Sequence, residues 1–294
     1  MKDELKKFLA YNEKFVVICT RTTELVEKAK QIHDLSPVAT AAFGRVLTMG
    51  CMMGAQMKSQ KNKLTIQIKG NGPLGTIIVT TNNFPRVKGC VTNPRIDLPL
   101  NEDGKLDVGQ AVGNYGFINV VKDLGLKEPY IGICPLSSGE IAEDFANYYV
   151  QSEQKQTAVG LGVLINKDGV KSSGGYLIQP MPDATQEEIS NVEKAIFEAG
   201  AVSKLLDQNI SLEELAKRVT GDENIKLIED IRYPIYECDC SKEYMAEGIK
   251  TLPEEELKEI IEEDEKAEIT CHFCNKKYNF SKQELEQILN NKKS

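Results

Sequence analysis

The sequence has no tryptophan and only two histidines among its 294 residues. His33 falls at the end of a predicted helix, where a structural role is expected, and His272 stands between two cysteines. A Ser-His-Asp or Cys-His site needs a histidine that acts as a base beside its nucleophile, and the sequence supports such a site poorly. We therefore expect no catalytic residues and a protein that is not an enzyme.

Long apolar runs are also missing. No run approaches the roughly 20 residues that a membrane-spanning helix needs, and the charged start leads into no apolar segment typical of a signal peptide. From these absences we expect a cytoplasmic protein with no membrane partner. Thiols are kept reduced in that compartment, so the eight cysteines indicate metal or redox chemistry rather than a disulfide scaffold.

An excess of positive charge is the third absence. The net charge is −8, and residues 237–268 hold thirteen acidic side chains against four lysines, which leaves the rest of the chain nearly neutral. Binding of phosphates requires a basic surface, so no nucleic-acid partner is expected. The acidic run Glu254–Glu265 is either a solvated helix face or a group of charges that raises the pKa of nearby thiols.

The patterns that are present divide the chain into three segments. Residues 1–180 alternate between predicted strands and helices, around a helix rich in small residues from Pro37 to about Lys58. Residues 181–236 contain short amphipathic helices that need a surface to dock on. Residues 237–294 have few large apolar side chains, so a metal is expected to hold their fold. We predict an α+β protein with a sheet-rich core domain and packed helices, a helical linker and a small zinc-binding domain.

Several local signals indicate individual elements. Gly70–Gly75 matches G-x-G-x-x-G but leads from one predicted strand into another, so we interpret it as a β-turn rather than a nucleotide-binding loop. A helix capped by Ser138 is expected to run to about Val150, and another short helix is expected at residues 223–231. Thr185 or Asp183 is expected to cap a helix in the linker.

Four of the eight cysteines form two close pairs, Cys238-Asp239-Cys240 and Cys271-His272-Phe273-Cys274, with thirty residues between them. Each pair can supply two thiolates from one short turn, which predicts a structural zinc site with four cysteine ligands and His272 outside the ligand set. The first pair has one spacer residue where most zinc ribbons have two. Its crowded thiols can also close on each other once the metal leaves, so the site can have two chemical states. The other cysteines are expected to be buried, inert thiols: Cys19, Cys51, Cys90 and Cys134.

Together these residues resemble the heat shock protein 33 family, also called the 33 kDa chaperonin, a redox-regulated holdase chaperone of bacteria. The spacing of the cysteine pairs is the hallmark of that family, and the resemblance extends over essentially the whole chain. Further stretches that fit are Thr23-Glu24-Leu25-Val26, Gly72-Pro73-Leu74-Gly75, Val91-Thr92-Asn93-Pro94, Ser138-Gly139-Glu140-Ile141-Ala142, Tyr149-Val150-Gln151-Ser152-Glu153-Gln154 and Gly174-Gly175-Tyr176-Leu177-Ile178-Gln179-Pro180.

The resemblance implies a specific activity. In the reduced form, Cys238, Cys240, Cys271 and Cys274 would hold one Zn²⁺. Oxidation would form the disulfides Cys238–Cys240 and Cys271–Cys274, release the ion and unfold part of the chain. The exposed apolar helix faces would then hold unfolding client proteins without ATP, and the active form would be a homodimer.

Two other functions stay open on the sequence alone. A constitutive protein-binding module with a purely structural four-cysteine zinc ribbon would bind its partner in the reduced form. A thiol-disulfide oxidoreductase would use Cys271 and Cys274, but no thioredoxin-like βαβ pattern surrounds that pair.

Overall fold

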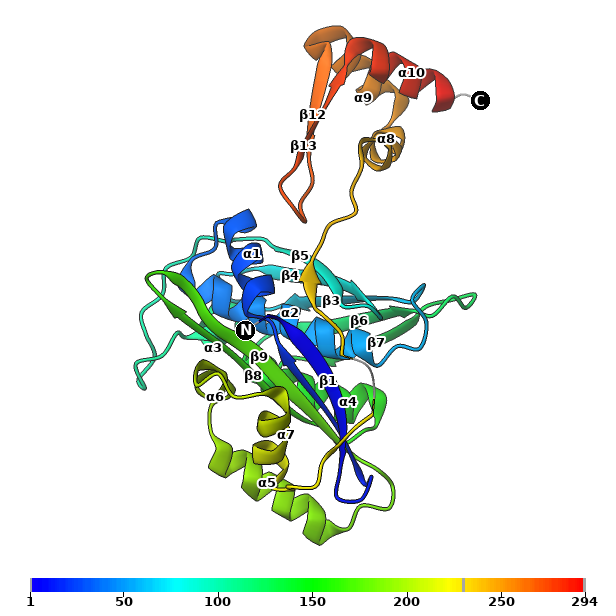
Figure 1. Ribbon diagram of the computed structural model, residues 1–294. Helices are drawn as coiled ribbons and strands as arrows, with labels where there is room; N and C mark the ends of the chain where they lie inside the picture. The colour runs from blue at the N-terminus through cyan, green and yellow to red at the C-terminus, as the bar shows by residue number, and fades with distance from the viewer. Residues whose placement is uncertain (1, 229–230, 293–294) are drawn as a thin grey trace. The chain divides into compact units, whose positions relative to one another are not determined.

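The computed structural model describes residues 2–228 and 231–292, and the chain folds into two compact units, Met1–Glu237 and Cys238–Ser294 (Figure 1). The strands of the first unit are β1 (Glu4–Ala10), β2 (Phe15–Arg21), β3 (Lys63–Lys69), β4 (Thr76–Asn82), β5 (Arg86–Val91), β6 (Phe117–Asp123), β7 (Tyr130–Pro135), β8 (Ala158–Asn166), β9 (Gly169–Pro180), β10 (Lys226–Leu227) and β11 (Ile235–Tyr236). Its helices are α1 (Thr23–His33), α2 (Pro37–Ala55), α3 (Val108–Val112), α4 (Ile141–Glu153), α5 (Gln186–Ala199), α6 (Val202–Asp207) and α7 (Leu212–Thr220).

Two sheets make up most of the first unit. One has the strand order β10-β1-β2-β9-β8, and the other has the order β11-β5-β4-β3-β6-β7. Helix α2 contacts strands of both sheets, so it is a central helix between two layers (Figure 1). Gly44 approaches Val163 of β8, whereas Gly50 approaches Val79 of β4. The small residues of α2 therefore allow both sheets to pack closely against the helix.

Helix α2 also corrects one expectation from the sequence. Its length and composition would be sufficient to cross a membrane, so the statement that no apolar run approaches that length is wrong. However, 94% of the most apolar stretch of α2 is buried inside the protein. Because the two sheets already cover this apolar surface, α2 is a core helix.

The helices of residues 181–236 dock on the outer face of the five-stranded sheet. Val192 of α5 and Leu215 of α7 lie in a buried cluster with Phe8 of β1 and Phe15 of β2. Thr185 caps α5 through a capping box with Glu188, as its sequence predicts. These helices are short, and the apolar sheet face gives them the surface that they need for stability.

Two predicted helices differ from the structure. Residues 223–231 do not form the expected helix in their described part, because β10 pairs with β1 through Leu227 and Phe8. Helix α4 begins at Ile141 with Glu140 at its N-cap rather than after Ser138, and the hydroxyl of Ser138 accepts a hydrogen bond from the backbone N–H of Glu140. At residues 223–231 a longer-range backbone partner replaced the local signal, whereas at Ser138 the expected serine binds the backbone just before the helix.

The glycine motif is a tight connection, as predicted. β3 ends at Lys69 and β4 begins at Thr76, so Gly70–Gly75 links two strands and opens no helix. A Cβ atom on Gly72 would lie 2.4 Å from the carbonyl oxygen of Ala111. The absence of a side chain at Gly72 therefore permits the turn to pack directly on the backbone of α3.

The second unit has a larger apolar core than its sequence suggested. Its elements are α8 (Lys242–Lys250), α9 (Glu254–Glu259), a π-helical turn η1 (Ile260–Asp264), the antiparallel hairpin of β12 (Lys266–Thr270) and β13 (Lys277–Ser281), and α10 (Lys282–Lys292). Leu257, Phe280 and Leu285 are buried in one cluster that also contains Cys271. The expectation of a thinly cored segment is thus wrong, because hairpin and helices gather their apolar residues on one side.

Candidate metal centre

The two cysteine pairs meet in the second unit. The sulfur atoms of Cys238, Cys240, Cys271 and Cys274 all lie within 4.8 Å of one another. The Sγ atoms of Cys238 and Cys271 are 3.7 Å apart, and those of Cys240 and Cys274 are 3.4 Å apart. Four sulfurs at Zn–S distances of about 2.3 Å would be about 3.8 Å from each other in a tetrahedron. The donor set and its spacing therefore fit a zinc ion.

The second pair is held by a tight turn between β12 and β13. The backbone N–H groups of Cys274 and Asn275 both donate to the carbonyl oxygen of Cys271, and the N–H of Cys271 donates to Lys276. Asn275 adopts a left-handed conformation with φ 57°, which asparagine tolerates better than most residues. This turn places both sulfurs of the pair on the same side.

The first pair is positioned by helix α8 and by the hairpin. Ser241 caps α8 by accepting a hydrogen bond from the backbone N–H of Tyr244. Lys242 forms an ion pair with Glu284 of α10, which connects the start of α8 to the C-terminal helix. Tyr278 of β13 donates from its hydroxyl to the carbonyl oxygen of Cys240 at 2.9 Å and contacts its sulfur at 3.1 Å. The Cys-x-Cys segment is thereby fastened to the hairpin that carries the other pair.

The thiols of the cluster differ in their acidity. Burial raises the pKa of Cys238 and of Cys274. Burial acts in the same direction on Cys240, but hydrogen bonds from Tyr278 and from the neighbouring thiols outweigh it and lower the pKa of Cys240 to about 7. The cluster therefore favours a thiolate at Cys240 before any metal binds.

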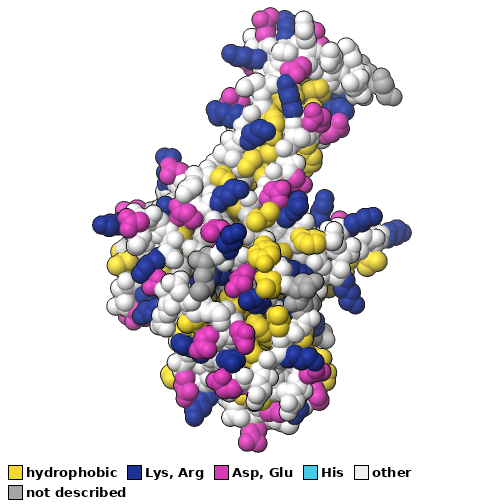
Figure 2. Space-filling view, viewed as in Figure 1, with side chains coloured by type: hydrophobic (Ala, Val, Ile, Leu, Met, Phe, Trp, Pro, Cys, Tyr) yellow, Lys and Arg dark blue, Asp and Glu magenta, His cyan; other side chains and the backbone are white. Residues whose placement is uncertain are grey.

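The acidic run lies on the surface, in agreement with the first of its two interpretations. In α9 and η1 the apolar residues Leu257 and Ile261 are buried, while most of the carboxylates are exposed. The main causes of the cysteine pKa shifts are burial, backbone hydrogen bonds, the other thiols and Tyr278, and no residue of the acidic run is among them. The run is thus a solvated helix face. On the side drawn in Figure 2, acidic and basic side chains are interspersed.

The remaining candidates occupy other positions. His272 is exposed, and His33 is buried in the first unit, where its Nε2 atom bonds to Tyr236. Cys134 lies buried on β7, and its sulfur contacts Gln151. Burial also raises the pKa of Cys134. The scattered cysteines Cys19, Cys51 and Cys134 are buried and Cys90 is half-buried. The four-sulfur cluster found among the described residues contains none of them.

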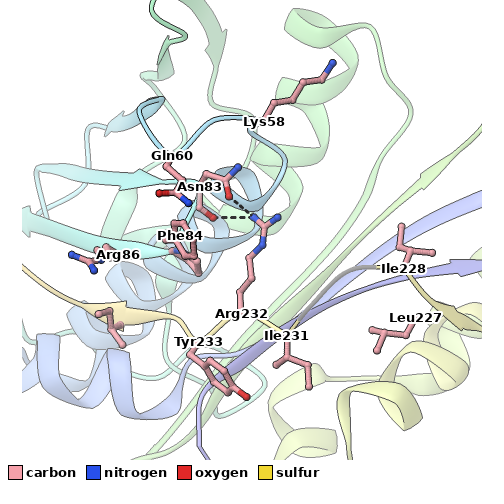
Figure 3. A pocket seen from close by; sticks show the side chains of 12 residues that line it. Lys58, Gln60, Asn83, Phe84, Arg86, Leu227, Ile228, Ile231, Arg232 and Tyr233 are labelled. Carbon is pink, nitrogen blue, oxygen red and sulfur yellow. Dashed lines mark hydrogen bonds between the residues drawn. The ribbon is translucent and has the colours of Figure 1, made fainter.

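The segment that leads to Cys238 is fastened firmly to the first unit. Arg232 donates to the backbone oxygen and the side-chain oxygen of Asn83, both at 2.9 Å (Figure 3), and also to the carbonyl oxygen of Ala55. Arg232 and Asn83 line a groove of about 980 Å³. Exposed apolar side chains such as Phe84 and Tyr233 also line this groove. Strand β11 comes next and pairs in parallel with β5.

Comparison with known proteins decides the family. The model of the Hsp33 protein family matches residues 3–281. The 33 kDa chaperonin of Thermoanaerobacter sp. (strain X514) is 44% identical over 290 residues, which cover 98% of each chain. This chain belongs to the Hsp33 family. The 33 kDa chaperonin of Bacillus cereus (strain AH187) is 43% identical over 292 residues, which cover 99% of this chain and 100% of that protein.

The Hsp33 fold is shared as well. The crystal structure of the 33 kDa chaperonin (heat shock protein 33 homolog) from Thermotoga maritima superimposes with a TM-score of 0.91 at 35% identity, over 99% of both chains. The predicted α+β class and the predicted family are therefore confirmed. The protein is an Hsp33 chaperone rather than an enzyme, with a four-cysteine cluster that can hold a metal ion.

The sequence did not reveal three residues, one at this centre and two on the segment that precedes Cys238. Tyr278 contacts Cys240, and Arg232 and Tyr236 fasten the segment before Cys238. Tyr278 is the one with a usable signal, because it lies four residues after Cys274 on an alternating strand, and such a strand returns toward the cysteine pair. Arg232 and Tyr236 have partners far away in sequence, which no local pattern reveals.

Proposed function

We propose that this Hsp33 chain is a redox-gated holdase whose four cysteines act as the switch. The observation that carries the proposal is the convergence of Cys238 and Cys240 with Cys271 and Cys274 inside 4.8 Å. In the reduced state the four thiolates hold one Zn²⁺, and such binding is worth about 10–16 kcal/mol in zinc peptides. The cluster then cross-links the segment after β11 to the β12–β13 hairpin.

Oxidation is the proposed trigger. Formation of a disulfide between Cys238 and Cys240, and of another between Cys271 and Cys274, would each take two electrons from a pair of thiolates. For each disulfide, one molecule of hydrogen peroxide accepts the two electrons, takes two protons from the solvent and becomes two molecules of water. The sulfurs then have no thiolate charge left for a metal, so the cross-link is lost.

The linker would transmit this change. We assign residues 1–180 to the chaperone core, residues 181–236 to the linker and residues 237–294 to the switch. The linker helices bury apolar side chains on the sheet, including Val192, Leu212 and Val219. Release of these helices would expose apolar surface for unfolding clients in the cytoplasm, and two exposed surfaces would pair in a homodimer.

The test combines metal content with activity. Peroxide at mildly raised temperature should release about one Zn²⁺ per chain, reduce the far-UV CD signal and suppress aggregation of a thermally unfolded client such as citrate synthase. Loss of zinc without any protection of the client would refute the proposal.

A second candidate has support from one observation. The second unit has an apolar core of its own, with Leu257 and Leu285 fully buried. That core would suit a constitutive binding module in which zinc is only a structural staple. In that case the reduced protein would protect the client and peroxide would inactivate it.

A further inference from the structure

One hydroxyl group reaches the candidate metal centre from outside the cysteine set. Tyr278 is 7% exposed, and its hydroxyl lies 3.1 Å from the sulfur and 2.9 Å from the carbonyl oxygen of Cys240. A phenol has a single proton, so these two acceptors share it. In the described part of the chain, the hydrogen bonds place such a hydroxyl donor at Cys240 and at none of the other three sulfurs.

The ring of Tyr278 is held so that the hydroxyl cannot swing away easily. Tyr278 pairs across the hairpin with Ile269, which lies two positions before Cys271. The ammonium group of Lys276 lies 5.1 Å from the centre of the ring. The hairpin that carries Cys271 and Cys274 thus also presents a donor to the opposite pair, and side-chain packing fixes its direction.

A hydrogen bond to a thiolate has two consequences. It orients the sulfur lone pairs, as the partners of metal ligands generally do, and loss of such a partner typically costs 10–100-fold in metal affinity. In the metal-bound state, where the sulfur is already a thiolate, it also withdraws charge from the sulfur and lowers its reactivity toward an electrophile. A neighbouring sulfur without such a donor keeps its full reactivity.

We propose that Tyr278 is a positioning residue for Cys240: its hydroxyl directs this sulfur toward the metal and protects it from oxidation. The inference rests on the proposed zinc-binding function and deepens it. Cys240 becomes the ligand that resists peroxide longest, and the hydroxyl of Tyr278 sets how much oxidant the switch requires.

The test uses the full chain with Tyr278→Phe, which keeps the ring and removes only the hydroxyl. Tyr244→Phe is the matched control, because Tyr244 lies on α8 of the same unit and is 71% exposed. Both variants and the parent are loaded with Co²⁺, and the sulfur-to-cobalt charge-transfer band is recorded. Loss of a hydrogen bond to one sulfur raises its donor level, so we expect a shift to longer wavelength in Tyr278→Phe alone.

A second readout resolves the individual cysteines. The zinc-loaded proteins are treated with N-ethylmaleimide, and the rate at each cysteine is read by fragment-ion mass spectrometry. We expect the rate at Cys240 to rise about 10-fold in Tyr278→Phe, in line with the usual effect of such partners, while the rates at Cys271 and Cys274 change little. Chelator-driven zinc loss should accelerate by a similar factor.

The outcomes separate this inference from the proposed function. If the parent binds zinc and is activated by peroxide while Tyr278→Phe matches Tyr244→Phe in band and rates, the role of Tyr278 is refuted and the switch stands. Equal acceleration at all four cysteines, or loss of the native far-UV CD signal, would mean that Tyr278 only supports the fold, which also overturns the inference. A parent chain that binds no metal would refute both.

Discussion

The hydroxyl oxygen of Tyr236 lies 2.8 Å from Nε2 of His33. The same hydroxyl donates to the carbonyl oxygen of Gly89 at 2.8 Å and accepts from the N–H of Gly89 at 3.3 Å. Tyr236 is 2% exposed and belongs to β11, two residues before Cys238. A helix end, a sheet strand and the segment that leads to the metal centre are therefore joined through one side chain.

Removal of this hydroxyl should weaken the first unit. Tyr236→Phe removes the buried hydroxyl to which both His33 and Gly89 form hydrogen bonds. Loss of a hydrogen-bond partner for a buried polar group costs about 1–3 kcal/mol of stability. We expect the free energy of unfolding of the reduced protein to fall by that amount in urea titrations followed by CD.

Tyr233→Phe is the control for this substitution. Tyr233 is 62% exposed on the same segment, and exposed substitutions usually stay within about 0.5 kcal/mol. Equal stability of the two variants would contradict the anchoring role of Tyr236.

Truncation of Leu215 should loosen the linker. Its side chain is fully buried between α7 and the sheet, and Leu→Ala at such sites costs about 2–5 kcal/mol. We expect Leu215→Ala to bind more of the apolar dye ANS in the reduced state. Glu213→Ala on the exposed side of α7 should leave dye binding unchanged; if both variants bind alike, α7 is not held by this contact.

Acid should weaken the docking of α5 through Glu188. A hydrogen bond from Lys14, at 2.7 Å, lowers the pKa of Glu188 to about 2 from its usual 4.5. A carboxyl whose folded-state pKa is depressed stabilises the fold above its unfolded-state pKa, and this stabilisation is lost as the pH falls from about 4.5 toward 2. We expect the urea midpoint to decline over that window.

Glu188→Gln isolates this effect, because glutamine keeps a capping-box side chain without the charge. The difference in urea midpoint between the parent and the variant should be largest at about pH 7 and should shrink below about pH 4.5. A difference that stays constant down to about pH 2 would show that the charge of Glu188 contributes nothing.

Single cysteine substitutions should separate the cluster from the scattered thiols. Cys271→Ser replaces a donor of the proposed zinc site with a poor one, so zinc content after purification should fall from about one ion per chain toward zero. Cys90→Ser, on β5 in the first unit, should retain the ion. A colorimetric zinc assay on both proteins decides this, and full zinc content in Cys271→Ser would remove Cys271 from the ligand set.

Much of the fold comes from local sequence patterns. The small residues between Pro37 and Ala55 predicted a closely packed helix, and Thr185 begins a helix as its capping pattern indicates. Such signals act over one or two helical turns, so they can be read without knowledge of the rest of the chain.

Other parts depended on partners far away in sequence. Lys226 and Leu227 form a strand rather than a helix, because the edge of β1 offers them backbone hydrogen bonds. The buried cluster that contains Leu257, Phe280 and Leu285 exists only once the hairpin and four helical segments, α8, α9, η1 and α10, come together. Neither outcome has a local cause that a sequence pattern could report.

The same division holds at the metal centre. The sequence alone determined which thiols can act together, because the spacing within each cysteine pair is set by a short turn. Only the tertiary structure decided that the two pairs meet within 4.8 Å, that Tyr278 donates to Cys240 and that Tyr236 anchors the segment before Cys238. Those contacts join residues up to 203 positions apart, and their geometry comes from the packing of whole elements rather than from neighbours in the chain.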